Sequence, residues 1–547
     1  MAKTRTFPFR YTLYVASIAG FLITLPLSVY WGGWYILPLL FAGLTALGTR
    51  DLVQSKRTVS RNYPIIAHFR YFFESIGPEI RQYFIESDTE ERPFSREQRT
   101  IVYQRAKNVL DKRPFGSQLN MYEEGFEWLN HSLRPTEIES NDFRIDIGKN
   151  CAKPYRASVF NISAMSFGSL SPNAILSLNK GAKLGNFYHD TGEGSISRYH
   201  REPGGDLVWE IGSGYFGCRN KDGSFSEEMF RKNASLDQVK MIELKLSQGA
   251  KPGHGGILPG EKVTAEIAEA RGVEPGKDVV SPASHPAFST PIEMLEFIEK
   301  LRELSGGKPV GFKLAIGHPW EWFAIVKAMQ ETGKKPDFIV VDGGEGGTGA
   351  APLEFINRLG EPLTEALLLV HNTLVGTNLR EDIAIGAAGK ITSAFGIART
   401  LALGADWCNA ARGYMFALGC IQALNCHTGK CPSGVATQDP RRGKKLDVED
   451  KSQRVYNFHK NTLDALRNLL AASGLNHPSA LGPEHILSRT SKTEIHSYLD
   501  LFRFLAPGAL LEGETGVRVY DKYWPVARSD SFDPPEFIME LRETKLR

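Results

Sequence analysis

Residues 310–349, VGFKLAIGHPWEWFAIVKAMQETGKKPDFIVVDGGEGGTG, decide the fold of this chain. The apolar runs Val310–Ile316 and Phe338–Val341 are short and bounded by glycine or proline, as expected of buried strands. The stretch Trp320–Thr332 between them has the length of a helix. A strand, a helix and a second strand in this order predict two parallel strands joined by a crossover helix.

The same alternation continues on both sides of this stretch. Further helical stretches are Pro291–Ser305 and Ser393–Leu403. The eight candidate strands are Ser158–Met165, Phe187–Asp190, Val208–Ile211, Met241–Leu246, Val310–Ile316, Phe338–Val341, Ile383–Ala387 and Trp407–Ala410. Eight such units predict an α/β fold of the (β/α)8 barrel type. An open, doubly wound sheet is the alternative, but the first strand is followed by SFGSLS and not by the dinucleotide fingerprint G-x-G-x-x-G.

The loops that follow these strands are rich in glycine, and in a barrel such loops carry the functional site. Their glycines let backbone amides approach a flat ligand or a phosphate closely, although glycines also simply make turns. The helix that begins near Ser393 is placed to face a phosphate. The loops are Ala164–Gly168, Thr191–Gly194, Gln248–Gly256, Asp342–Gly349, Gly389–Lys390 and Arg412–Gly413.

Three charged residues on these strands and loops are candidates for chemistry. Lys251, in Gly-Ala-Lys-Pro-Gly, and Glu193, in Thr-Gly-Glu-Gly, are candidates for acid–base or anion-binding roles, with an exposed surface pair as the alternative. Lys313 lies inside a strand, where a lysine costs free energy unless it meets an anion.

Three of the six cysteines gather in one loop. Cys420, Cys426 and Cys431 form C-x5-C-x4-C followed by proline. Thiolates suit an iron–sulfur cluster or zinc. A zinc site completed by His427 fits less well, because adjacent Cys426 and His427 rarely reach one tetrahedral ion. Buried free thiols are the third alternative, and we expect Cys151, Cys218 and Cys408 to be structural.

The N-terminus is long and apolar, with no charged residue from Tyr11 to Thr49. A membrane-spanning helix needs roughly 17–25 residues. Two helices fit, Tyr11–Tyr30 and a second from Trp34 to Leu47 or slightly beyond, and basic residues on both flanks predict a hairpin with both ends in the cytoplasm. One span with a re-entrant piece is the alternative. The formal net charge of +3 offers no basic field for nucleic acid.

These motifs together resemble a known family. MSFGSLS at 165–171, TGEG at 191–194, SQGAKPG at 247–253, GGTGA at 346–350 and GCIQALNCHTGKCPSGVATQDP at 419–440 are similar to the FMN-binding synthase domain of glutamate synthase. Residues 51–150, with RQYF and PFSREQR, resemble short members of this family that carry a membrane hairpin. The resemblance implies a barrel with FMN at its mouth and a [3Fe–4S] cluster on Cys420, Cys426 and Cys431.

The resemblance also implies roles for individual residues. Lys251 and Glu193 would be catalytic, and Met165, Ser166 and Lys251 would bind substrate. Lys313 would face the electron-rich edge of the flavin. The implied cofactor contacts are Ala164, Met165, Gln248, Lys313, Gly346, Gly347, Thr348, Gly389, Lys390, Arg412 and Gly413.

The chain departs from the family pattern at several positions. Ile257 stands where the family has a glutamine that helps to hold 2-oxoglutarate, and His254 replaces a glutamate. Pro282–Pro286 replaces a Pro-Pro-His-His-Asp stretch, and Ala387-Ala388-Gly389 replaces Asp-Gly-Gly. The glutaminase domain and a dinucleotide-binding module are missing from the sequence, so ammonia or an amine and an external electron donor, such as ferredoxin or another reductase, are expected partners.

We therefore expect an oxidoreductase that aminates 2-oxoglutarate, or a related 2-oxo acid, reductively. An N-substituted glutamate synthase that uses an alkylamine, and a membrane electron-transfer subunit without amino-acid turnover, are the alternatives. The expected location is the inner or cell membrane, with the catalytic domain in the cytoplasm. The expected domains are the transmembrane hairpin at 1–50, a helical connecting region at 51–150, the barrel with its iron–sulfur loop at 151–475 and a loop-rich extension at 476–547.

Overall fold

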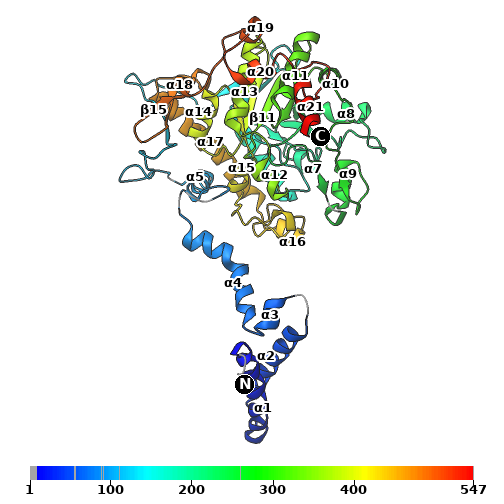
Figure 1. The fold of residues 1–547 in the computed structure, drawn as a ribbon, viewed down its shortest axis with the longest axis vertical. Helices are drawn as coiled ribbons and strands as arrows, with labels where there is room; N and C mark the ends of the chain where they lie inside the picture. Colours follow the sequence, from blue (N-terminus) through cyan, green and yellow to red (C-terminus); the bar gives the residue numbers. More distant parts are fainter. Residues whose placement is uncertain are drawn as a thin grey trace. The chain divides into compact units, whose positions relative to one another are not determined.

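The computed structural model describes residues 9–545, apart from 55–56, 88, 90–91, 110 and 259 and the side chains of Pro78 and Ile257. The chain divides into two compact units, Met1–Arg96 and Glu97–Arg547 (Figure 1). We describe each unit by itself.

The larger unit is built on a closed barrel of eight parallel strands. They are β4 (Phe160–Ile162), β5 (His189–Asp190), β6 (Leu207–Ile211), β7 (Val239–Lys245), β10 (Val310–Leu314), β11 (Phe338–Asp342), β12 (Ala384–Ala388) and β13 (Trp407–Ala410). The last strand pairs with the first, with Ala410 opposite Ile162. This closure confirms the predicted barrel over the open sheet, and all eight predicted strands are present.

Helices cover the barrel and form its outer layer. They are α6 (Pro172–Gly185), α7 (Arg198–Arg201), α8 (Glu227–Ala234), α9 (Ala265–Arg271), α10 (Pro291–Leu304), α11 (Pro319–Thr332), α12 (Leu353–Arg358), α13 (Leu363–Gly376), α14 (Ala394–Ala402) and α15 (Arg412–Ala417). Side-chain caps explain where several begin. Thr290 and Glu293 form a capping box at α10, and Ser393 accepts from the amide of Gly396 at α14.

An antiparallel hairpin closes the N-terminal end of the barrel. It consists of β2 (Arg144–Ile147) and β3 (Tyr155–Ser158). Its Ile147 and Ala157 join the buried cluster that contains Tyr188 and Trp407. Trp407 Nε1 donates to the Tyr188 hydroxyl at 2.8 Å, so this polar pair is satisfied within the core.

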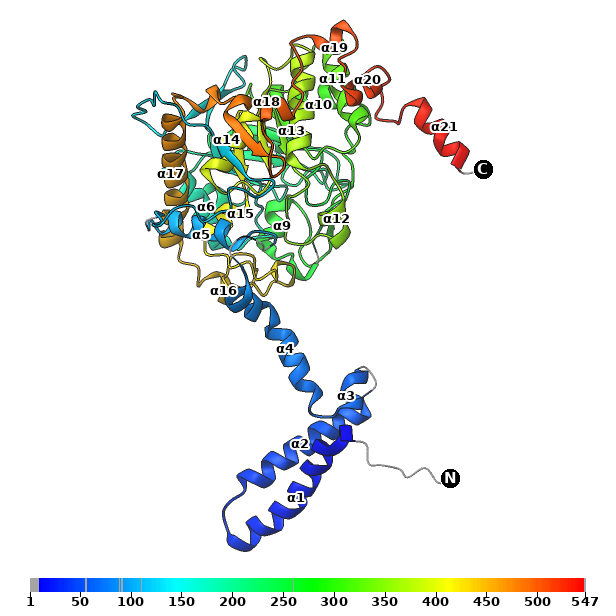
Figure 2. The same cartoon turned by 60° about the vertical axis from the view of Figure 1, so that its left-hand side comes forward.

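Further elements surround the barrel. The long helix α17 (Val448–Ala472) packs on α6, where Gly181 lets Val455 approach (Figure 2). The others are α5 (Arg96–Ala106), β1 (Glu127–Leu129), β8 (Ile257–Leu258), η3 (Gly260–Lys262), β9 (Val279–Val280), η4 (Cys426–Thr428), α16 (Pro440–Gly443), η5 (Pro478–Ala480), η6 (Pro483–His485), β14 (Ile486–Arg489), β15 (Ile495–Ser497), α18 (Tyr498–Leu501), α19 (Ala509–Glu512), α20 (Arg518–Tyr523) and α21 (Glu536–Lys545). Strands β1, β14 and β15 form a small separate sheet.

The smaller unit begins with a helical hairpin. A 3-10 turn, η1 (Phe9–Tyr11), leads into α1 (Thr12–Trp31), and α2 (Ile36–Val53) returns beside it. The stretches Phe9–Trp31 and Ile36–Val53 are long and apolar enough to cross a membrane, a test that buried core helices and signal sequences also pass. Only 11% and 17% of their apolar windows are buried, which differs from a core helix.

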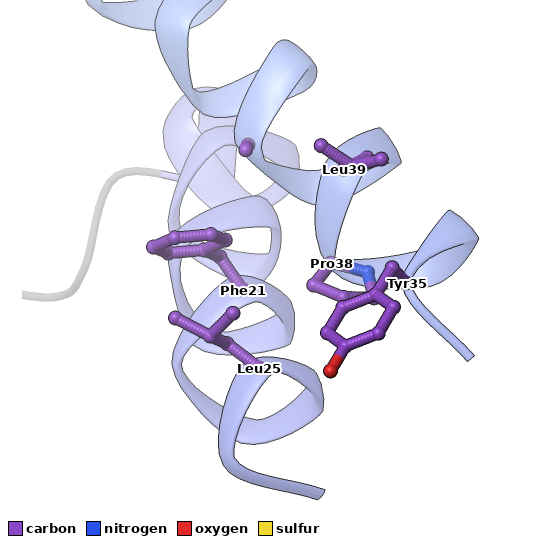
Figure 3. A pocket seen from close by; sticks show the side chains of 6 residues that line it. Phe21, Leu25, Tyr35, Pro38 and Leu39 are labelled. Carbon is purple, nitrogen blue, oxygen red and sulfur yellow. The ribbon is translucent and has the colours of Figure 1, made fainter. Parts of the chain in front are cut away.

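Close packing and hydroxyl groups hold the two hairpin helices together. The ring of Tyr14 crosses Gly48, and its hydroxyl lies 2.9 Å from Thr49 Oγ1. Small residues and hydroxyl pairs of this kind are typical of helix contacts in membranes. Near the turn, an apolar hollow of about 280 Å³ is lined by Phe21, Leu25, Tyr35, Pro38, Leu39 and Ala42 (Figure 3). The unit continues through α3 (Thr58–Asn62), α4 (Ala67–Ile80) and the π-helical turn η2 (Arg81–Ile85).

Candidate functional site

A cluster of charged side chains lies at the C-terminal ends of the barrel strands. Lys245, the last residue of β7, donates to Glu193 Oε2 at 2.5 Å. Lys251 and Arg271 also act on the Glu193 carboxylate electrostatically. Three cations surround one anion here, so the cluster carries an excess of two positive charges.

The charges in this cluster shift one another's pKa values. Burial alone would raise the pKa of Glu193, but Lys245, Lys251 and Arg271 outweigh it and lower this pKa to about 2. Burial lowers the pKa of Lys251. The charge of Glu193 opposes this decrease, and the charge of Lys245 increases it. At neutral pH Glu193 is therefore ionised, and Lys251 loses its proton more readily than an ordinary lysine does.

Two of these cations were not singled out from the sequence. Lys245 lies within the predicted strand Met241–Leu246, and Arg271 ends α9. The Arg271 guanidinium is buried, and its Nε has no hydrogen-bond partner among the described residues. Its Nη2 lies 3.2 Å from the position that a Cβ on Gly194 would take. Alternation along β7 could have identified Lys245, whereas nothing local identifies Arg271.

Lys313 lies inside the barrel among carboxylates. Its Nζ contacts Glu210 and lies 3.0 Å from Glu243 Oε1 and 3.8 Å from Asp190 Oδ2. Burial opposes the charge on Lys313, but these carboxylates keep its pKa well above the ordinary value. The anion that a buried lysine requires is thus supplied by the protein itself. Contact with a flavin edge remains a prediction.

Two carboxylates at the top of the barrel fix the loops above it. Asp190 Oδ1 accepts from the amide of Gly192 at 3.0 Å, and Asp342 Oδ2 accepts from the amide of Gly249 at 2.8 Å. A Cβ on Gly249 would lie 1.8 Å from the carbonyl oxygen of Gly343, so only glycine permits this approach. These contacts join the Gln248–Gly256 loop to the Asp342–Gly349 loop.

The loop after β4 joins the same assembly. The amide of Met165 donates to the carbonyl of Asp190 at 3.2 Å. The backbone of Ser166 lies against Gly192, with its nitrogen 2.9 Å from a Cβ built there. Ala164, Met165 and Ser166 are therefore brought beside the Glu193 loop, as the barrel predicted.

Arg412 connects a second group of loops. It begins α15 directly after β13, and its Nη2 donates to the carbonyl oxygen of Thr348 at 2.8 Å. Burial raises the pKa of Cys420, and the charge of Arg412 opposes that rise. Cys426 Cβ lies 3.8 Å from a Cβ built on Gly349. The Gly346–Gly349 segment thus adjoins the cysteine loop.

The three cysteine sulfurs share one neighbourhood. Burial raises the pKa of Cys420, and the charges of Cys426 and Cys431 add to the shift. Burial opposes the Cys431 thiolate, but the Ser433 hydroxyl and the amides of Ala436, Ser433 and Val435 lower the pKa of Cys431. Donors aimed at a buried sulfur stabilise a thiolate, which is the form that binds metal.

The spacing of these sulfurs can be compared with the spacing of ligands around a single ion. Around one zinc ion at about 2.3 Å, ligand sulfurs lie less than 4 Å apart. Among the described residues, only one group of three histidine, cysteine, aspartate or glutamate side chains has all its ligand atoms within 4.8 Å of one another. That group is Asp190, Glu210 and Glu243, and it contains no cysteine. The three cysteine sulfurs are therefore not all as close together as the ligands of one zinc ion, and an iron–sulfur cluster at this loop stays a prediction.

The loop itself is anchored from two sides. The Tyr103 hydroxyl on α5 donates to the carbonyl of Cys420 at 2.6 Å, and Lys262 Nζ donates to the carbonyl of His427 at 2.7 Å. Helix α5, which carries Tyr103, begins at Arg96.

The predicted phosphate site lies between β12 and β13. Gly389 and Lys390 follow β12, and Lys390 has φ of +52°. Helix α14 begins at Ala394, with Ser393 as its cap. Gly413 lies within α15 against the Phe458 ring of α17, and its predicted contact with the cofactor stays a prediction. A basic loop followed by a helix N-terminus fits a phosphate group.

Two of the departures from the family pattern, His254 and His285, have described surroundings, and His285 contacts the backbone of Lys245. The His254 ring packs edge-on against Phe355, with ring centres 5.3 Å apart. His285 is buried, and its Nε2 lies 2.8 Å from the carbonyl oxygen of Lys245. Burial lowers the pKa of His285 to about 4, so it is neutral and supports Lys245 through the backbone. The structure does not describe the side chain of Ile257.

Comparisons with known proteins show which family this chain resembles. Residues 118–476 match the family model described as the conserved region in glutamate synthase. The glutamate synthase large subunit-like protein YerD of Bacillus subtilis is 42% identical over 483 residues, which is 80% of this chain and 91% of YerD. An archaeal glutamate synthase [NADPH] of Methanocaldococcus jannaschii is 37% identical over 357 residues, covering 65% of this chain and 66% of that protein.

Similar solved structures include a mutant flavocytochrome b2 with pyruvate bound. Its TM-score is 0.42 at 12% identity, over 76% of this chain and 85% of that chain. A mandelate oxidase mutant with a monooxide FMN adduct has a TM-score of 0.38 at 14% identity, over 70% of this chain and 89% of that chain.

Proposed function

Because the chain belongs to the glutamate synthase family, whose members are oxidoreductases acting on CH–NH2 donors, we propose that it aminates 2-oxoglutarate, or a related 2-oxo acid, reductively. The observation that carries this proposal is the charged cluster at the barrel mouth. Its excess of two positive charges matches a dicarboxylate, which brings two negative charges.

The binding roles follow from where the cations lie. Arg271 is buried with donor capacity to spare, and its planar guanidinium suits a carboxylate. Lys245 is engaged by Glu193 and holds that side chain in place. Lys251 is half-buried and has no such close ion pair among the described residues, so it is available to the reacting end of the substrate.

Lys251 is also suited to move a proton. When ammonia adds to the 2-oxo carbon, the nitrogen–carbon bond forms and the carbonyl oxygen leaves as water with two protons from nitrogen. Because the pKa of Lys251 is lowered, its Nζ gives up its proton more readily than an ordinary lysine does, so that a larger share of molecules carries the neutral amine that can act as a base. Glu193 stays ionised and keeps the neighbouring cations oriented.

Two cofactors fit the remaining residues. We assign FMN to the mouth loops around Met165, Gln248 and Gly347, with its phosphate at Lys390 and the start of α14. We assign a [3Fe–4S] cluster to Cys420, Cys426 and Cys431. When bound, FMN supplies hydride chemistry and the cluster supplies single-electron transfer. Arg412 lies between the two proposed sites, since it contacts Thr348 and acts on Cys420.

The partners in this proposal are ammonia or an amine and a separate electron donor, such as ferredoxin or another reductase. The exposed apolar helices α1 and α2 support attachment to the inner or cell membrane as a hairpin. The proposed domains are the hairpin at 1–50, the connecting region at 51–150, the barrel at 151–475 and the C-terminal extension at 476–547.

Oxidation of the dithionite-reduced protein tests this function. We expect 2-oxoglutarate with ammonia to reoxidise the flavin rapidly and to yield glutamate, while either compound alone does not. Faster reoxidation with methylamine would point to the N-substituted glutamate synthase, which the changed positions His254 and Ile257 keep open. Flavin that is reoxidised by neither amine would contradict the proposal and favour an electron-transfer subunit.

A further inference from the structure

Helix α4 and the turn η2 carry an apolar stripe that is exposed among the residues that the structure describes. Phe69, Phe72 and Phe73 are 62%, 55% and 57% exposed, and Tyr83 and Phe84 are 58% and 85% exposed. With the half-buried Ile76 and Ile80, these residues recur at three- and four-residue spacing, which places them along one side of a helix. Such a large exposed apolar surface calls for a partner.

The charges beside the stripe indicate what kind of surface it meets. Residues 50–61, which lead into α4, contain four lysines and arginines against one acidic residue, an excess of three positive charges, whereas residues 67–85 carry two arginines and two glutamates. Arg70 pairs with Glu74 at 2.6 Å on the polar side of α4, and the Arg57 guanidinium lies 4.7 Å from the centre of the Tyr71 ring. Aromatic residues combined with arginine are typical of helices that lie in the interface of an anionic membrane.

The connection to the hairpin fixes the start of α4 next to the end of α2. Asp51, near the end of α2, is buried and accepts from the amide of Ile65 at 3.0 Å. Its other contact is His68 Nε2, at 2.9 Å, in the first turn of α4. The start of α4 is therefore clamped to the end of α2 that carries Arg50. In Figures 1 and 2, α4 leaves this end at a wide angle to α1 and α2 and does not continue their direction.

We propose that α4 and η2 form an interfacial helix that lies on the anionic lipid surface, with its aromatic stripe among the headgroups. This inference rests on the proposed membrane hairpin. It adds a second mode of attachment, in the plane of the membrane, and the Asp51–His68 clamp sets the depth of the helix.

Site-specific fluorescence on the full-length protein in lipid vesicles tests the inference. One environment-sensitive fluorescent amino acid is placed at Phe72 on the stripe, at Ser75 off the stripe, or at Leu22 on α1. The vesicles contain phosphatidylglycerol and phosphatidylcholine with bromine at a shallow or a deep position of the acyl chain. We expect deep bromines to quench the probe at 22. Shallow bromines should quench the probe at 72 several-fold more than the probe at 75.

The three positions separate the two ideas. Quenching at 22 without a difference between 72 and 75 would overturn the interfacial helix while leaving the hairpin intact. No quenching at 22 would overturn the hairpin and the inference together. Protection of position 72 from aqueous acrylamide without bromine quenching would show a protein partner instead of lipid. With all phosphatidylglycerol replaced by phosphatidylcholine, we expect quenching at 72 to fall, and an unchanged signal would contradict the role of the arginines.

Discussion

At the scale of single residues, the cysteine loop gives the most direct test of the cofactor assignment. Replacing Cys426 by serine removes one proposed ligand from a loop that Tyr103 and Lys262 hold in place. We expect Cys426→Ser to lose its iron, because a cluster bound by three sulfurs tolerates no loss of a thiolate. Iron and sulfide analysis of the purified protein measures this. Cys151→Ser is the matched control, since Cys151 lies 3.1 Å from Asp337 in a different region. Full iron content in Cys426→Ser would refute the ligand assignment.

The ion pair of Glu193 and Lys245 predicts a pH-dependent contribution to stability. The folded pKa of Glu193, about 2, is below the ordinary 4.5, so its stabilisation is present above pH 4.5 and is lost as the pH falls toward 2. The shift corresponds to about 3 kcal/mol. We expect the unfolding free energies of the wild type and Glu193→Gln to differ most at pH 6 and to converge below pH 4.5.

Urea denaturation at a series of pH values measures this difference. Glu354→Gln on the exposed face of α12 is the control and should change stability by less than about 0.5 kcal/mol at every pH. A constant difference between the wild type and Glu193→Gln from pH 6 to pH 3 would show that the carboxylate is not held in its charged form.

At the scale of secondary-structure elements, the sequence pattern predicted the strands and helix starts, because neighbouring residues determine them. The eight strands were predictable because each is a short apolar run between glycine-rich turns, and the start of α14 because Ser393 is a capping residue. Arg271 could not be predicted, because only the fold brings the end of α9 to Glu193. The carboxylate partners of Lys313 come from β5, β6 and β7, so its surroundings depend on barrel closure.

The contact between α6 and α17 shows how closely two of these elements fit. A Cβ on Gly181 would lie 2.4 Å from Val455 Cγ1 and 2.9 Å from the carbonyl oxygen of Ser452. We therefore expect Gly181→Ala to destabilise the protein by about 1–3 kcal/mol, despite alanine's better helix propensity. Thermal and urea denaturation measure the loss.

A double variant separates side-chain crowding from backbone crowding at this contact. Adding Val455→Ala should recover part of the loss, and the remainder reflects the Ser452 carbonyl. Gly317→Ala is the control, because a Cβ there meets nothing within 4 Å. A Gly181→Ala protein as stable as the wild type would mean that the two helices separate at little cost.

At the scale of the whole molecule, the division into two units predicts that attachment and cofactor binding are separable. Every residue assigned here to substrate, FMN or the cluster lies within Glu97–Arg547, and so do the strands that close the barrel. In the other unit, Leu22, Ile36 and Leu39 are 65%, 80% and 70% exposed, so the hairpin contributes apolar surface and no barrel core. Removing residues 1–85, which takes away both the hairpin and the proposed interfacial helix, should therefore move the protein from the membrane fraction to the soluble fraction without changing its flavin and iron content per chain. Cell fractionation followed by cofactor analysis measures both quantities. If the truncated protein lost flavin or iron, the barrel would depend on the first unit for its folding. Burial within the second unit alone would then be insufficient to hold the cofactor loops in place.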